Sequence, residues 1–247
     1  MIVEVIGGIF TNSLALLSDA GHMLSDALSL AIALAAFKFG EKRADTSRTF
    51  GYKRFEILAA VFNGITLILI AVFIVIEAIG RFANPPEVAT TGMLIIAVIG
   101  LIVNIVVARI LMTGDTHDNL NMKGALLHVM GDLLGSVAAI AAALAIIFFG
   151  WGIMDPIASV IVAVLISISG YRILKQSLHV LMEGVPENID INEIIKKINA
   201  VDGVDGSHHL HVWSITSGVN AMSAHIVVHG TLNVHETQKI ISRIEHE

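Results

Sequence analysis

No cysteine occurs among the 247 residues of the chain. Thiolate metal ligands, disulfide bonds and redox-active thiols are therefore excluded, and any bound metal must be held by nitrogen and oxygen atoms. Charge is also scarce, at 15% of residues, and the net charge of −6 comes with no long basic run, so nothing indicates nucleic-acid binding. The N-terminus lacks the basic segment and the cleavage site of a signal peptide.

Hydrophobic residues dominate what is present. They make up 55% of the chain, and the mean hydropathy is +0.80, which is typical of an integral membrane protein. A membrane crossing takes about twenty apolar residues. Five stretches are predicted to be spans: 14–37, 57–76, 88–108, 124–154 and 156–171. Segment 1–11 is too short, and we interpret it as the end of a spanning helix whose beginning is absent.

Basic residues predict the orientation of these spans. The loop 38–54 holds six of the fifteen lysines and arginines, and short loops rich in Lys and Arg stay in the cytoplasm. This loop, the loop 109–123 and the tail after Arg172 are therefore all predicted to be cytoplasmic. At the membrane surface, Arg54 and Glu183 are close enough in this topology to form an ion pair, although two independently solvated charges are an equal alternative.

The composition becomes that of a soluble domain after residue 184. We therefore predict a transmembrane domain at 1–184 and a cytoplasmic domain at 185–247. The second domain shows a helical stripe at 189–200, alternating strands at 208–215 and 221–228, and a capped helix at 233–247. Turns are predicted at Asp202-Gly203 and Asp205-Gly206. The order helix, strand, strand, helix lacks the final strand of a small split α/β sandwich.

Two predicted spans carry the same pair of ionisable residues, His22 with Asp26 and His128 with Asp132. A separation of four brings each His and its Asp to one helix face, so two packed helices offer two nitrogen and two oxygen ligands, as tetrahedral zinc sites do. Four such groups without a function would cost about 10 kcal/mol in a bilayer, which favours a metal site over a structural polar cluster. Asp19 shares the face and is predicted either to line the approach or to cap the helix.

Several motifs together resemble one known family, the cation diffusion facilitators, and especially bacterial cobalt–zinc–cadmium resistance proteins and animal zinc transporters. The matching stretches are SLALLSDAGHMLSD at 13–26, FGYKRFE at 50–56, LHVMGD at 127–132, DP at 155–156 and LHVW at 210–213. The resemblance implies a membrane all-α bundle of six helices per subunit, a small cytoplasmic α/β ferredoxin-like domain and a homodimer. By this comparison, most of the first helix and the last strand are missing.

The resemblance also implies export of a divalent metal in exchange for protons. The family's transport site falls on His22, Asp26, His128 and Asp132, a His/Asp pairing associated with zinc preference. Some members have a second, histidine-based site in the loop after the second helix, but 45–53 contains no histidine, so that site is not expected here.

A cytoplasmic zinc site is implied more loosely, at His208, His225 and His235. Strand alternation raises an objection, because His208 and His225 converge only if His208 lies at the mouth of its strand. Simple solvated histidines are an equal alternative. The other histidines of this domain are interpreted as non-ligands: His209, His211 and His229.

The charge of the main site suggests how metal and protons are exchanged. Two ionised Asp with two neutral His carry −2, which either one Zn²⁺ or two added protons cancel, and metal binds only deprotonated imidazole. Zn²⁺ is thus expected as cargo, and also as a regulatory ion, with protons as counter-ions. Nitrogen and oxygen ligands also accept Cd²⁺, Co²⁺ and Mn²⁺.

Three other functions would use some of the same residues. A metal-gated channel uses the same ligands, and a membrane-bound metal sensor accounts for the cytoplasmic histidines but not for the ionisable groups inside the spans. An intramembrane metalloprotease needs a motif such as His-Glu-x-x-His, which the sequence lacks. The protein is therefore not predicted to be an enzyme.

Overall fold

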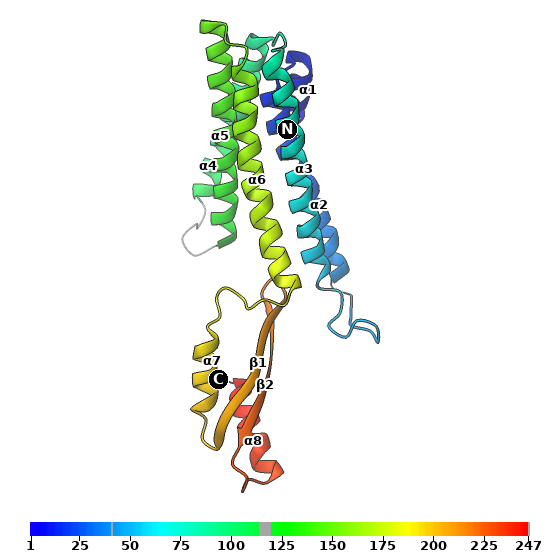
Figure 1. Ribbon diagram of the computed structural model, residues 1–247, viewed down its shortest axis with the longest axis vertical. Helices are drawn as coiled ribbons and strands as arrows, with labels where there is room; N and C mark the ends of the chain where they lie inside the picture. The colour runs from blue at the N-terminus through cyan, green and yellow to red at the C-terminus, as the bar shows by residue number, and fades with distance from the viewer. Residues whose placement is uncertain (41, 114–119, 247) are drawn as a thin grey trace. The chain divides into compact units, whose positions relative to one another are not determined.

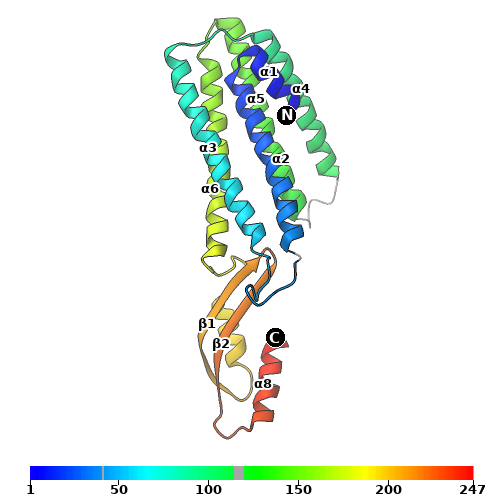
Figure 2. The same ribbon diagram turned by 90° about the vertical axis from the view of Figure 1, so that its right-hand side faces the viewer.

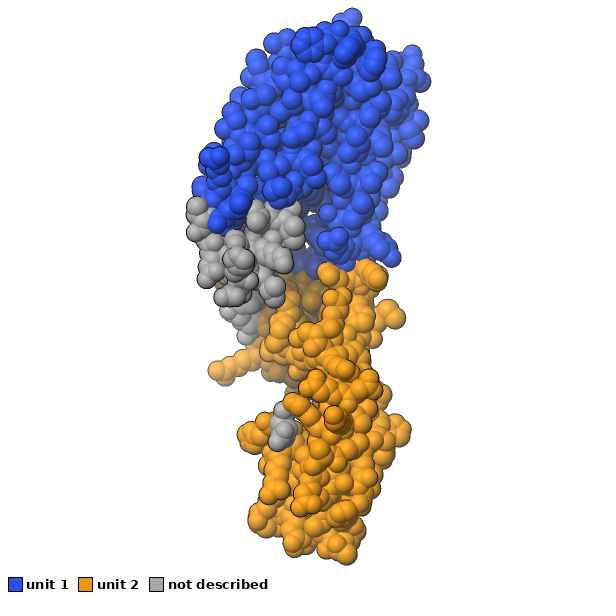
Figure 3. All heavy atoms as spheres, turned by 90° about the vertical axis from the view of Figure 1, so that its left-hand side faces the viewer, with its two compact units in different colours: residues 1–34, 59–174 blue, residues 35–58, 175–247 orange. Residues whose placement is uncertain are grey.

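The computed structural model describes residues 1–40, 42–113 and 120–246, without the side chains at 33, 37, 113 and 120–128. The chain divides into two compact units (Figure 3). The first comprises Met1–Leu34 and Ala59–Leu174, and the second comprises Ala35–Leu58 and Lys175–Glu247.

Helices make up the membrane part of the chain (Figure 1). They are α1 (Ile2–Thr11), α2 (Leu14–Gly40), α3 (Phe55–Ala83), α4 (Thr90–Thr113), α5 (Leu120–Phe149) and α6 (Met154–Leu181). Within the described ranges, α2 to α6 are the five helices long and apolar enough to cross a membrane, and α1 is a short apolar helix. The prediction of five spans is confirmed.

Most observed helices extend past the apolar runs that predict them. The sequence interpretation placed 77–86 in a loop, but α3 continues to Ala83. Within that extension, Arg81 Nε lies 3.1 Å from Glu77 Oε1, one helical turn away. Such a pair stabilises a helix outside the bilayer core, where hydropathy gives no signal.

Small side chains fill the centre of the first unit. One buried cluster joins α2, α4, α5 and α6 through Ala15, Leu16, Met93, Ala97, Ala139, Ala142, Ala143 and Ala158. Large apolar side chains are instead exposed along the helices, for example Phe73 and Phe148. Membrane helices pack in this way, because close backbone contact replaces the hydrophobic effect that water provides elsewhere.

Helices α3 and α6 run side by side (Figures 1 and 2) and approach each other closely at two glycines. A Cβ atom added to Gly64 would lie 3.0 Å from the Gly170 carbonyl oxygen, and one added to Gly170 would lie 3.1 Å from the Gly64 oxygen. Only glycine fits at both positions. The neighbouring residues Leu67, Ala71 and Ile166 are buried in the same seam.

Asp155, which is fully buried at the start of α6, caps the start of α2. It accepts hydrogen bonds from the Leu14 backbone N–H at 2.8 Å, the Ala15 N–H at 3.2 Å and the Ser13 hydroxyl at 2.6 Å. Arg81 Nη1 lies 3.8 Å from the same carboxylate. The buried charge is thus compensated by helix N–H groups and by a cation.

The second unit contains α7 (Ile191–Asn199), β1 (Val204–Thr216), β2 (Val219–Val228) and α8 (Val234–His246). The two strands form an antiparallel hairpin, so the predicted order helix, strand, strand, helix is confirmed. Asn233 and Glu236 form the predicted cap of α8, because each accepts a hydrogen bond from the backbone N–H of the other.

One turn prediction in this unit is wrong. Asp205-Gly206 does not end a segment but lies inside β1, where the register slips between Val204 and Gly206. Val204 pairs with Val228 and Gly206 with Val227, so β1 has one extra residue between the two pairs. This is a β-bulge. A bulge and a turn favour the same Asp-Gly pair, so the sequence alone does not separate them.

The predicted ion pair between Arg54 and Glu183 is confirmed, because Arg54 Nη2 lies 3.1 Å from Glu183 Oε1. Both residues belong to the second unit. In the same unit, Glu56 in the first turn of α3 accepts hydrogen bonds from the hydroxyls of Thr216 at 2.5 Å and Ser217 at 2.8 Å, at the hairpin turn. The start of α3 is therefore attached to the hairpin.

Candidate metal centre

Three of the four predicted transport ligands lie together between α2 and α5. His22 Nδ1 lies 3.6 Å from Asp26 Oδ2 on the same helix. His22 Nε2 lies 3.9 Å from Asp132 Oδ1 on α5. The helical spacing of four accounts for the first contact, and the packing of α2 against α5 provides the second.

The two ring nitrogens of His22 therefore face two different carboxylates. A metal ion binds a ring nitrogen in its deprotonated form, and both carboxylates lie within 4 Å of that ring.

Solvent access is unequal across this group. The side chains of His22, Asp26 and Asp132 are 15%, 26% and 9% exposed, respectively. Asp132 is the most enclosed of the three, so its charge has the greatest need for compensation.

The fourth predicted ligand, His128, belongs to α5 and precedes Asp132 by one helical turn. Its side chain lies outside the described residues. The backbone is helical at both positions, as the predicted spacing requires.

Asp19 does not cap α2, because the carboxylate at that helix start belongs to Asp155. Asp19 is instead buried at 3% exposure and faces α5, where its Oδ1 lies 2.8 Å from the position of a Cβ on Gly135. Glu4 of α1, also buried, and Asp132 are close enough to act on its charge. Acidic groups of α1, α2 and α5 are therefore buried near one another.

Sequence interpretation left Glu4 and Asp155 without a role. Each is a single carboxylate within an apolar stretch. Placing such a group inside a membrane costs free energy, so its presence in the sequence indicates a role. The donors to Asp155 come from a distant segment, which spacing does not reveal.

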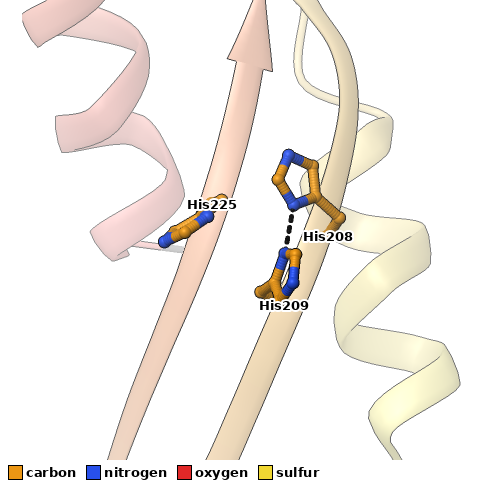
Figure 4. A group of neighbouring side chains, drawn as sticks. All are labelled: His208, His209 and His225. Atoms are coloured by element: carbon orange, nitrogen blue, oxygen red, sulfur yellow. Dashed lines mark hydrogen bonds between the residues drawn. The ribbon is translucent and has the colours of Figure 1, made fainter.

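A second cluster lies on the hairpin, where His208, His209 and His225 converge (Figure 4). Each residue offers one ring nitrogen, and these atoms lie within 4.8 Å of one another. His208 Nδ1 and His209 Nδ1 are 2.6 Å apart, a hydrogen bond in which one nitrogen donates to the other. All three side chains are exposed.

The objection from strand alternation does not hold. His208 and His225 are direct partners in the antiparallel register, which brings two cross-strand side chains to one face. The register then slips between His208 and His211, and His209 adopts φ 51°. This bulge turns His209 toward His208, although simple alternation would place it on the opposite face.

The remaining histidines are not members of this cluster as the structure describes it. His235 is in the first turn of α8, so it is His209, and not His235, that completes the group. His229 Nδ1 lies 2.5 Å from Asp205 Oδ1. The sequence interpretation, which paired His235 with His208 and His225 and set His209 aside, differs from the geometry because it could not detect a bulge.

Comparisons with known proteins cover the whole chain. Residues 1–182 match the cation efflux transmembrane domain, and residues 186–247 match the cytoplasmic domain of cation efflux proteins. Together these matches extend over both parts of the chain.

Three curated relatives show the extent of the similarity. The cadmium, cobalt and zinc/H(+)-K(+) antiporter of Bacillus subtilis (strain 168) is 61% identical over all of this chain and 80% of its own length. The metal cation efflux system protein CzcD of Cupriavidus metallidurans is 48% identical over 92% of this chain and 72% of its own. The zinc transporter ZitB of Escherichia coli (strain K12) is 43% identical over all of this chain and 78% of its own. The chain therefore belongs to the cation diffusion facilitator family of cation efflux proteins.

Proposed function

We propose that this chain exports divalent metal cations, with zinc as the principal cargo, in exchange for protons. The observation that carries this proposal is the position of His22 between Asp26 and Asp132 inside apolar helices. The relatives named for antiport of cadmium, cobalt and zinc and for zinc transport support it.

As a member of this family, the chain is a multi-pass membrane transporter and not an enzyme, and its C-terminal domain is cytoplasmic. We place the boundary between the two domains at residues 184 and 185. The finer architecture that we propose has α1 in the place of the first helix of a six-helix arrangement, a ferredoxin-like form for the cytoplasmic domain, and a homodimer as the working assembly.

The proposed transport ligands are His22, Asp26, His128 and Asp132. Two carboxylates and two imidazoles match the ligand number and type of tetrahedral zinc. With both Asp ionised, one Zn²⁺ or two protons on the histidines makes the site neutral. Both loaded states therefore avoid carrying a net charge through the membrane.

Competition for the same nitrogen atoms couples the two fluxes. Protonation of His22 blocks metal binding at that ring, so a proton and a metal ion cannot occupy it together. An alternating-access rearrangement then moves metal outward and up to two protons inward per cycle. The inward proton gradient drives the export.

The hairpin cluster is proposed as a regulatory metal site. His208, His209 and His225 provide three nitrogens, with water completing the coordination. His235, which the family resemblance places in this site, is the alternative third ligand. No carboxylate belongs to the cluster among the described residues, so a bound Zn²⁺ keeps its charge, which an exposed site tolerates because water solvates it.

Reconstitution in liposomes tests the proposed transport. Purified protein is placed in vesicles that contain a zinc-sensitive dye, and Zn²⁺ flux is followed with and without an imposed pH gradient. We expect the gradient to accelerate zinc flux, a protonophore to remove the acceleration, and protein-free vesicles to show neither effect. Zinc flux that is indifferent to the gradient contradicts proton antiport, and a steady zinc conductance would indicate a channel.

A further inference from the structure

The loop between α2 and α3 has an ordered structure that the transport mechanism does not use. Asp45 Oδ1 accepts hydrogen bonds from the Ser47 N–H at 2.8 Å, the Ser47 hydroxyl at 2.6 Å and the Arg48 N–H at 2.9 Å. The Tyr52 hydroxyl donates to Asp45 Oδ2 at 2.7 Å. The Asp45 carboxylate therefore holds the two halves of the loop together.

These bonds also keep Asp45 ionised. The Ser47 side chain, followed by the Tyr52 hydroxyl, holds the pKa of Asp45 well below its usual range. The carboxylate is thus occupied by the loop's own donors, and it forms no ion pair with the loop's cations among the described residues.

Two cations are positioned by the Tyr52 ring. Lys42 Nζ and Arg48 Cζ each lie 4.7 Å from the ring centroid, within the range of cation–π attraction. Gly51, with φ 74°, makes the turn that brings the ring back to Lys42. An L side chain is strained in that conformation.

The loop therefore presents a surplus of positive charge. Among the described residues, Arg54 is paired with Glu183, whereas Lys42, Arg43, Arg48 and Lys53 have no carboxylate within ion-pair distance. Phe50, which lies between Arg48 and Lys53 in the sequence, is 63% exposed. Cations around an exposed aromatic side chain are typical of surfaces that contact a membrane interface.

A cavity of about 380 Å³ opens beside Arg48, Phe50 and Tyr52. Its lining includes Ser47, Arg48, Phe50, Phe55 and Leu58, with Glu183, held by Arg54, also at the wall. A guanidinium, a hydroxyl and apolar side chains together suit a phosphate that is attached to a hydrocarbon chain.

The chain's topology places this loop beside the lipid. It joins the last turn of α2 to the first turn of α3, both of which are spans. Since four helices separate it from a cytoplasmic C-terminal domain, it lies on the cytoplasmic side. That leaflet carries the anionic lipids of the membrane.

We propose that the loop 42–54, which we call the Tyr52 loop, binds the phosphate headgroups of anionic phospholipids in the cytoplasmic leaflet. Lys42 and Arg48, fixed on the Tyr52 ring, contact the phosphate, and Phe50 inserts among the first carbons of the acyl chains. Each basic residue strengthens the preference for anionic over zwitterionic lipid by about fivefold.

The test measures which lipids remain bound to the purified protein. The protein is placed in nanodiscs of phosphatidylcholine with phosphatidylglycerol, extracted in mild detergent, and the retained lipids are quantified by mass spectrometry. We expect enrichment of phosphatidylglycerol that falls at least fivefold in the double variant Lys42→Gln/Arg48→Gln. Arg109→Gln/Arg172→Gln removes two charges from the ends of other spans and should leave the enrichment nearly unchanged. Equal losses in the two double variants would overturn the proposal.

Two variants that leave the charge of the loop unchanged distinguish lipid binding by the ordered Tyr52 loop from general electrostatic attraction to its basic residues. Tyr52→Ala removes the ring under both cations, whereas Tyr52→Phe keeps the ring and loses only the bond to Asp45. We expect Tyr52→Ala to lower the enrichment more than Tyr52→Phe, and equal enrichment in both contradicts the proposed arrangement. A third arm adds inorganic phosphate: release of phosphatidylglycerol at millimolar phosphate would identify a site for the free anion and overturn a lipid site.

Discussion

Two groups of histidines in this protein occupy opposite environments. His22 lies inside apolar helices with carboxylates on both sides, whereas His208, His209 and His225 lie on an exposed hairpin. Ionisable groups inside a membrane cost about 2.5 to 3.5 kcal/mol each on insertion scales, and exposed histidines cost almost nothing. The buried group therefore requires a functional explanation, and the exposed group does not.

The two groups also differ in charge. In the proposed function Asp26 and Asp132 neutralise a divalent ion at His22, but the hairpin cluster contains no carboxylate among the residues that the structure describes. Neutralisation matters for an ion that must cross a membrane and is unnecessary for an ion that stays in water. A carried ion and a resident ion are therefore expected to respond differently to substitution.

The largest effect is expected at Asp132. Asp132→Asn keeps the side-chain shape but removes the charge that cancels the metal. Zinc flux in liposomes should fall more than the about 10- to 100-fold that loss of a supporting group costs a metal site. The control Asp205→Asn changes a carboxylate that pairs with His229 in the exposed domain and should leave the flux nearly intact. An Asp132→Asn protein that no longer folds, judged by gel filtration, would instead assign Asp132 a structural role.

The next effect concerns selectivity. His22→Asp replaces a nitrogen ligand with oxygen, which suits irregular coordination better than tetrahedral zinc. The ratio of zinc to cadmium flux should decrease by about tenfold. Glu77→Asp, in the outward helical turn that contacts Arg81, serves as a control. An unchanged ratio in His22→Asp would count against His22 as a ligand.

A smaller effect on transport, but a clear one on binding, is expected at the hairpin. His209→Ala should weaken zinc binding to the full chain about tenfold or more by calorimetry, measured in an Asp132→Asn background so that the transport site is silent. His235→Ala should leave that affinity unchanged. The opposite pattern would restore His235 as the third ligand, and flux in the otherwise native chain should change little in either variant.

The smallest effect is expected for the pair of Arg54 and Glu183. Their side chains are 38% and 61% exposed, and exposed pairs contribute about 0.2 to 1 kcal/mol. Arg54→Glu should therefore reduce zinc flux modestly, and Arg54→Glu with Glu183→Arg should recover part of it. Additive losses in a double-mutant cycle would show that the two charges act independently.

Local sequence patterns predicted the helices and the pairing within each helix. The spans follow from the length of the apolar runs, and the approach of His22 to Asp26 follows from a spacing of four. The contact of His22 with Asp132 needed two helices to pack, and sequence made it only a hypothesis. His128 is the corresponding histidine on α5, one helical turn before Asp132.

Local patterns did not reveal features that depend on a distant partner or an irregular backbone. Asp155 caps a helix 140 residues earlier in the chain, which no local spacing encodes. His209 joins its cluster because β1 bulges there, and strand alternation assumes that no bulge occurs. Asp19 was assigned two possible roles because both a cap and a buried acid fit the same sequence context.

The glycine contact between α3 and α6 determines where a chemical probe is tolerated. Any side chain at Gly64 or Gly170, including a cysteine that carries a spin label, pushes two backbones apart. Positions on α2 and α5 leave that seam intact. Because the sequence has no cysteine of its own, a pair introduced on those two helices carries the only reactive thiols. The native sequence is therefore a ready background for measuring the distance between the helices of His22 and Asp132 during turnover.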